Sequence, residues 1–108
     1  MIVITVKWYV KPEFADDFPA LTRDFTDATR AEPGCLWFEW GRSTENPCIY
    51  YLTEAFADGA AGSAHVGSEH FKTAMATQGR YAARRPQIVS FEVPGDGWSE
   101  LGEIQLDA

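Results

Sequence analysis

The sequence predicts an α+β fold in which helices cover one face of a single antiparallel sheet. Segments rich in β-branched and aromatic residues alternate with segments of helical periodicity, in the order strand, helix, strand, strand, helix, strand. A short polar loop joins the two central strands, which is typical of an antiparallel hairpin. This order is the ferredoxin-like β-α-β-β-α-β arrangement, and a chain of 108 residues is long enough for one such domain.

The first strand is predicted over residues 2–10, a β-branched and aromatic run that ends at Lys11-Pro12. A helix is then predicted from about Asp16 to Ala31, because apolar residues recur at alternating steps of four and three: Phe14, Phe18, Leu21, Phe25 and Ala28. Pro19 would lose a backbone hydrogen bond in the middle of a helix. A start near Asp16 avoids this loss, because it places Pro19 in the first turn.

Pro33-Gly34 ends this helix and opens the predicted hairpin. Its strands cover residues 35–43 and 48–56, and both carry apolar side chains on both faces. Helices can cover only one of these faces, so the other is expected to meet a second subunit in a homodimer. Cys35 and Cys48 fall at opposite ends of the hairpin, roughly 25 Å apart at about 3.3 Å per residue, which excludes a disulfide.

The second half of the chain predicts two short helices and a last strand. Asp58 is a plausible N-cap for a helix through Val66, and Ser68 for a helix over residues 69–78. The fourth strand is predicted over residues 86–93 and completes a domain of residues 1–97. The tail, residues 98–108, holds four large apolar side chains and is expected to pack on the domain or on a partner subunit.

The composition of the chain argues against several classes of binding partner. The formal net charge of −7 argues against nucleic acid and against anionic membranes, because both bind clustered Lys and Arg. The sequence has no apolar run long enough to span a bilayer and no leader pattern, so a cytoplasmic protein is expected. It also lacks phosphate-binding glycine loops, and no cofactor is expected.

Three pieces of the sequence together resemble the antibiotic biosynthesis monooxygenase (ABM) domain: Glu32-Pro33-Gly34-Cys35-Leu36, Glu54-Ala55-Phe56 and Ala64-His65-x-x-Ser68-x-His70-Phe71-Lys72. The stretch that bears them covers about two fifths of the chain, and their order and spacing are fairly specific to the family. The resemblance implies a dimeric α/β-barrel, in which two ferredoxin-like sheets pair. It also implies a cofactor-independent monooxygenase that oxidises a quinol or polycyclic phenol with molecular oxygen.

Two other functions fit the same resemblance. One is an isomerase that acts by enolisation on a small, in some cases phosphorylated, carbonyl compound; the other is a non-catalytic dimeric module that binds a ligand. The haem-degrading branch of the family fits poorly. It uses an Asn on the first strand, which is absent here, and its Trp and His positions are held by His65 and Met75.

His65 and Glu54 are the candidate catalytic residues. A neutral imidazole at His65 could take a proton from a phenol or an enolisable carbon, or the side chain could instead hold a helix end. Glu54 lies between Leu52 and Phe56 on one strand face, where a carboxylate needs a partner. Its alternative role is a structural ion pair. A one-residue shift in strand register would turn it to the other face of the sheet.

Aromatic residues are the candidate lining of a flat substrate pocket, with core packing as the alternative role of each: Trp8, Phe38, Trp40, Phe56 and Phe71. His70 is expected at the surface or in a dimer contact. The spacing of five between His65 and His70 would place them on different sides of a helix, so no metal site is expected. Arg80, Arg84 and Arg85 are expected in a solvated turn that could also close over an anionic substrate.

Overall fold

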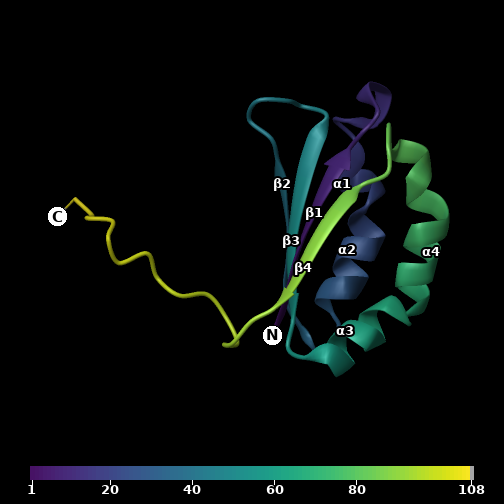
Figure 1. Cartoon of the computed structure of the whole chain (residues 1–108). Helices are drawn as coiled ribbons and strands as arrows, with labels where there is room; N and C mark the ends of the chain where they lie inside the picture. The colour runs from purple at the N-terminus through teal and green to yellow at the C-terminus, as the bar shows by residue number, and fades with distance from the viewer. Residues whose placement is uncertain (108) are drawn as a thin grey trace.

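The computed structural model describes residues 1–107 and has a single four-stranded antiparallel sheet with all its helices on one face (Figure 1). The strands lie in the spatial order β2-β3-β1-β4. Their bounds are β1 Ile2–Tyr9, β2 Cys35–Arg42, β3 Ile49–Phe56 and β4 Gln87–Glu92. The α-helices are α1 Phe18–Leu21, α2 Arg23–Arg30, α3 Gly59–Val66 and α4 Glu69–Thr77, with 3-10 turns η1 Pro12–Phe14 and η2 Gln78–Tyr81. The predicted α+β, ferredoxin-like fold is confirmed.

The register of the sheet decides which way Glu54 points. In β3, Glu54 pairs with Ile4 of β1 on one side and with Phe38 of β2 on the other. Side chains at paired positions share a face of a sheet. Because Phe38 is fully buried beneath the helices, Glu54 faces the same helix-covered side.

The prediction of one helix from Asp16 to Ala31 is wrong. The chain instead forms α1 and α2, which meet at Thr22. The Thr22 hydroxyl donates a hydrogen bond of 2.9 Å to the Phe18 carbonyl oxygen, and such bonds to the preceding turn bend helices. Pro19 lies in the first turn of α1, as predicted, where its missing backbone N–H costs no helical hydrogen bond.

The buried stripe of α1 and α2 also differs from the predicted one. Phe18 is buried as expected, but Leu21 is exposed, and the fully buried positions that follow are Thr22, Thr26 and Thr29. Thr26 donates its hydroxyl hydrogen to the Thr22 carbonyl oxygen at 2.8 Å, which satisfies the hydroxyl inside the core. Thr22, Thr26 and Thr29 thus join the buried face of these helices, while Phe25 and Ala28 of the predicted stripe are half-buried.

The helix starts predicted in the second half are both confirmed. The Asp58 carboxylate accepts a hydrogen bond from the Ala61 N–H at 2.8 Å and caps α3. The Ser68 hydroxyl oxygen accepts one from the Phe71 N–H at 3.2 Å and caps α4. The same hydroxyl donates to the His65 carbonyl oxygen at 2.6 Å, so Ser68 ties the end of α3 to the start of α4.

Gly34, directly before β2, allows α3 to pack closely against the start of this strand. A Cβ at this position would overlap the Cβ of Ala61 on α3, so only glycine fits. The Gly34 carbonyl oxygen also accepts a hydrogen bond of 2.9 Å from the Ala57 N–H. This close approach brings the loop that carries Glu32 against α3.

The second face of the sheet is open to solvent in the single chain. Tyr51, Val89 and Phe91 on it are 41%, 53% and 60% exposed. The tail leaves β4 and extends away from the domain on this side (Figure 1). Trp98 contacts Trp37 with ring centroids 4.7 Å apart and the rings tilted by 39°, but Trp98, Leu101, Ile104 and Leu106 are all exposed. The last predicted tail residue, Ala108, lies outside the described residues.

None of the helices in residues 1–107 has the length and apolar character needed to cross a membrane. Both cysteines are free, in agreement with their separation across the hairpin.

Candidate active site

A cavity of about 400 Å³ lies between the helix-covered face of the sheet and helix α4 with the end of α3. Its walls are mainly apolar, and the sheet contributes Ile4, Val6, Trp8, Trp40, Leu52 and Ile88. Four of the lining side chains are polar: Glu54, His65, Gln78 and Arg85. A largely apolar cavity of this size with few polar groups is typical of a small-molecule site.

Glu54 is held in this cavity as a weak acid. It is only 6% exposed, and none of the Lys and Arg side chains in residues 1–107 forms an ion pair with it. Burial raises the pKa of its carboxyl group from the ordinary 4.5 to about 7, and the negative charge of Glu32 adds to the rise. Glu54 can therefore both accept and donate a proton near neutral pH.

His65 lies at the end of α3 and is 4% exposed. Its Nδ1–H donates a hydrogen bond of 2.8 Å to the Oε2 atom of Glu32. Its Nε2 atom lies 3.9 Å from the Oε1 atom of Glu54. A carboxylate only accepts hydrogen bonds, so the bond to Glu32 requires a proton on Nδ1. In the neutral ring, Nε2 on the Glu54 side is then the basic nitrogen.

Aromatic rings hold the imidazole of His65 in place. Phe56 stacks on it with ring centroids 4.7 Å apart and an interplanar angle of 28°. Phe71 meets it edge-on, with centroids 5.1 Å apart. These contacts and the bond to Glu32 restrict the ring to one orientation, which a base that acts on a bound substrate requires.

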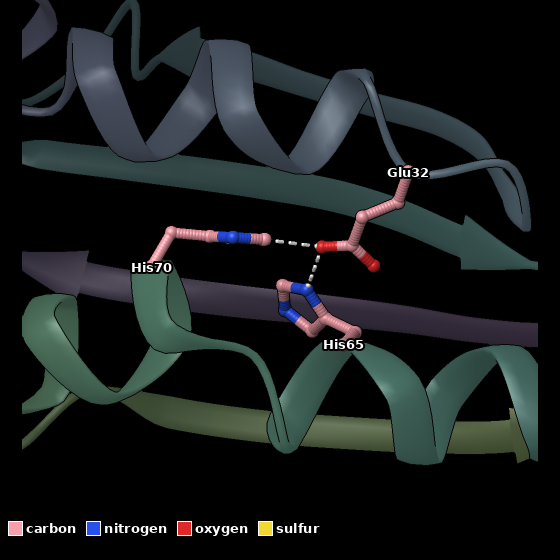
Figure 2. Close-up of side chains that lie close together, drawn as sticks. All are labelled: Glu32, His65 and His70. Carbon is pink, nitrogen blue, oxygen red and sulfur yellow. Dashed lines mark hydrogen bonds and ion pairs between the residues drawn. The ribbon is translucent and has the colours of Figure 1, made fainter.

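His70 contacts the same carboxylate as His65, which Figure 2 shows. Its Nε2–H donates to Glu32 Oε2 at 2.5 Å, and its side chain is 26% exposed. The expectation that the two histidines point to different sides of a helix is therefore wrong. The helix breaks at Gly67 and α4 starts in a new direction, so the rings approach Glu32 from two separate helices.

The predicted aromatic lining divides into two groups. Trp8, Trp40 and Phe71 line the cavity. Phe38 and Phe56 do not: both are fully buried and pack against His65 instead, so their prediction as pocket walls is corrected. Sequence alternation places them on the correct face of the sheet, but His65 of α3 stacks on Phe56, and Phe25 of α2 packs edge-on against Phe38.

Two further polar residues line the cavity, one at the end of the predicted helix over residues 69–78 and one in the loop before β4. The Gln78 side chain is 5% exposed, and its Oε1 atom is buried with no hydrogen-bond partner. Arg85 reaches the cavity from the loop before β4, whereas Arg84 lies over the Tyr9 ring at 4.7 Å. Of the three arginines considered from sequence, Arg85 is the one that lines the cavity.

Glu32 is the residue that sequence reasoning missed. It lies in a loop, outside any periodic pattern, and its side chain is 14% exposed. The signal that could have revealed it is its position directly before Pro33-Gly34, inside a motif already singled out. Only the tertiary contact with α3 and α4 gives it two histidine partners.

Comparisons with known proteins agree with this architecture. A family model described as antibiotic biosynthesis monooxygenase matches residues 1–77. The structure of a candidate antibiotic biosynthesis monooxygenase from Caulobacter crescentus is 28% identical with a TM-score of 0.80, and the match covers 87% of this chain and 90% of that one. A similar candidate from Nitrosomonas europaea is 26% identical with a TM-score of 0.78, over 86% and 98% of the two chains. The comparison with curated proteins gave no match.

A third structure, a candidate of the same kind from Deinococcus radiodurans, has a TM-score of 0.81 over 94% of this chain and 100% of that one. At 20% identity it supports the fold alone. The family model spans the first three strands, the helices between them and the segment with Glu32, Glu54, His65 and His70. This chain belongs to the antibiotic biosynthesis monooxygenase family.

Proposed function

We propose that the protein is a cofactor-independent monooxygenase that oxidises a quinol or polycyclic phenol with molecular oxygen. The observation that carries the proposal is the pairing of His65 and Glu54 at one apolar cavity, with Nε2 and Oε1 3.9 Å apart. Membership of a monooxygenase family supports the same reaction class.

The shape and chemistry of the cavity favour an aromatic substrate. Trp8, Trp40 and Phe71 offer ring faces and edges to a flat molecule. The volume of about 400 Å³ is that of a small-molecule site. The unpaired Oε1 atom of Gln78 needs a donor, and a phenolic O–H supplies one.

The first chemical step is removal of a phenolic proton. His65 Nε2 is the base, and Glu32 accepts Nδ1–H and stabilises the imidazolium that forms. Glu54 lies beside Nε2 and can exchange protons with the base near neutral pH. The apolar walls disfavour ionised groups, so a proton acceptor inside the cavity is needed to form the phenolate.

The phenolate supplies all the electrons that the reaction requires. It transfers an electron to O₂, and the resulting radical pair joins through a new carbon–oxygen bond to form a hydroperoxide. Cleavage of the O–O bond with loss of the ring hydrogen leaves one oxygen atom in a quinone and the other in water. A phenol and O₂ thus give a quinone and water, and the proton held by His65 returns to the departing oxygen. The reaction therefore needs no external reductant.

An isomerase that acts by enolisation is the second candidate function. Arg85 favours it, because its guanidinium lines the cavity and would pair with an anionic carbonyl substrate. His65 and Glu54 would then move a proton between two carbons. The two functions differ in a simple measurement, because isomerisation consumes no oxygen.

The test is oxygen uptake by purified protein with a panel of quinols and polycyclic phenols in air. EDTA is present and no cofactor is added. We expect uptake with at least one compound, with one oxygen atom from ¹⁸O₂ in the quinone product. His65→Ala should reduce kcat by on the order of 100-fold or more. Glu69→Gln is the surface control, because this side chain is 92% exposed at the start of the neighbouring helix α4.

Absence of uptake across the panel would count against the oxidation. A carbonyl product from a phosphorylated sugar, formed without oxygen, would favour the isomerase instead. Full activity of His65→Ala on a confirmed substrate would remove His65 from the mechanism.

A further inference from the structure

We propose that Glu32, His65 and His70 form a binding site for a divalent transition-metal ion, with Zn²⁺ as the best match. The site lies on the Nδ1 side of His65, whereas the proposed oxidation uses Nε2. The site shares Glu32 and His65 with the proposed oxidation, and a metal on Nδ1 would leave the ring proton on Nε2, so a bound ion would withdraw the base. Metal binding itself is tested without any reference to the oxidation.

The geometry brings three metal-ligating atoms together. His65 Nδ1, His70 Nε2 and Glu32 Oε2 all lie within 4.8 Å of one another (Figure 2). A Zn²⁺ ion bound at about 2.0–2.2 Å from each atom needs separations of roughly 3–3.5 Å between them. Glu32 Oε2 is 2.8 Å from His65 Nδ1, so a small outward rotation of the flexible glutamate opens the space.

The ligand set is one that first-row divalent metals prefer. Two imidazoles and one carboxylate suit Zn²⁺, and three protein ligands leave a fourth position for water or another ligand. His70 is 26% exposed, which gives an ion a route from solvent, while Glu32 and His65 are 14% and 5% exposed. The site is thus partly buried but accessible.

The local charge favours a cation. Glu32 and Glu54 lie on opposite sides of the His65 ring, and in residues 1–107 neither forms an ion pair with Lys or Arg. The Glu32 carboxylate, with no fixed cation beside it, places a negative charge against both imidazoles. A divalent ion would compensate this charge, with the histidines as ligands rather than as hydrogen-bond donors.

Glu54 is placed as the outer carboxylate that often accompanies a histidine ligand in metal centres. Histidine ligands commonly donate their second ring N–H to a carboxylate, which fixes the tautomer and orients the ring. A metal on Nδ1 would place the proton of His65 on Nε2, 3.9 Å from Glu54 Oε1. A small closure of this gap would form the outer hydrogen bond. Four residues on four separate segments therefore have the relative positions that a metal centre needs.

The test uses untagged full-length protein, stripped with EDTA and exchanged into chelator-free buffer. Co²⁺ is titrated while visible absorption is followed, because four-coordinate Co²⁺ has strong bands. Zn²⁺ is then added to displace it, and Zn²⁺ binding is measured directly by calorimetry. We expect one ion per chain, micromolar or tighter affinity, and full displacement of Co²⁺ by Zn²⁺.

Variants separate this site from adventitious binding. Glu32→Gln and His70→Ala each remove one ligand and should weaken Zn²⁺ binding by more than about 100-fold. Glu54→Gln alters the outer carboxylate and should weaken it by roughly 10- to 100-fold. Glu69→Gln should leave binding unchanged, because its carboxylate is exposed beside Lys72.

Absence of Co²⁺ bands together with absence of Zn²⁺ heat would overturn the proposal. Equal affinity in the wild type and in His70→Ala would do so too. If Glu32→Gln fails to fold, as judged by circular dichroism, the partly exposed His70→Ala and His70→Gln variants decide the question. None of these readouts depends on catalytic activity.

Discussion

The raised pKa of Glu54 makes the unfolding free energy of the protein depend on pH. Burial raises the pKa of its carboxyl group from 4.5 to about 7, so the folded protein binds the proton more tightly than the unfolded chain. At about 1.4 kcal/mol per pKa unit, the rise corresponds to roughly 3 kcal/mol of unfolding free energy. This is a large share of the total stability of a small domain.

The sign of this pH dependence follows from proton binding in the folded and unfolded states. Below a pH of 4.5, Glu54 is protonated in both states and contributes its full share of stability. Between 4.5 and about 7, the unfolded chain releases the proton while the folded protein keeps it, so stability falls as pH rises. Above the folded pKa the loss is complete, because the charged carboxylate is then buried.

The perturbation is Glu54→Gln, which keeps the shape of the side chain but cannot ionise. We expect the variant to gain stability relative to the wild type as pH rises, by about 2–3 kcal/mol between roughly pH 5 and pH 8.5. Urea unfolding at both pH values, at one protein concentration and in EDTA, measures the difference. Glu69→Gln controls for charge removal at the surface.

The refuting result is a difference between Glu54→Gln and the wild type that stays constant with pH. It would mean that Glu54 ionises equally in the folded and unfolded states. The cavity would then hold a solvated carboxylate, and the proton exchange with His65 would lose its basis.

Three further predictions concern the assembly and the site. The open second face of the sheet predicts a homodimer, so light scattering at micromolar concentration should give about twice the chain mass of 12.0 kDa, and a monomer would contradict it. Deletion of residues 98–108 should weaken this dimer or lower Tm, because large apolar side chains of the tail are exposed in the single chain; unchanged dimer affinity and Tm would show that the tail stabilises neither the dimer nor the fold. Gly34→Ala should cost about 1–3 kcal/mol in urea unfolding, because its methyl group would overlap Ala61, whereas Gly41→Ala meets no atom within 4 Å and is the control; equal losses would refute the argument from close packing.

Much of the fold could be predicted from local sequence patterns. Asp58 and Ser68 begin α3 and α4 as expected, since an N-cap bond joins residues only three apart. The strands of the hairpin were predicted to within a residue or so, because alternation and the short polar loop between them act over short distances. The break at Thr22 was missed, because a threonine hydroxyl can bend a helix without any change in apolar periodicity.

The candidate site could be predicted only in part, for the same physical reason. His65 and Glu54 stand out because one lies near the end of a capped helix and the other interrupts an apolar strand. Their common cavity, however, depends on the pairing of Glu54 with Ile4 and Phe38, and a shift of one residue in register would reverse its direction.

Glu32 and His70 show what only the tertiary structure decided. Glu32 lies 33 positions before His65 and 38 before His70, and no periodic pattern joins them. Their contact depends on the close packing of Gly34 against α3 and on the change of direction at Gly67. Sequence determined the elements and their order because those depend on neighbouring residues. The charge network around His65 was decided by packing between distant segments, which sequence spacing does not encode.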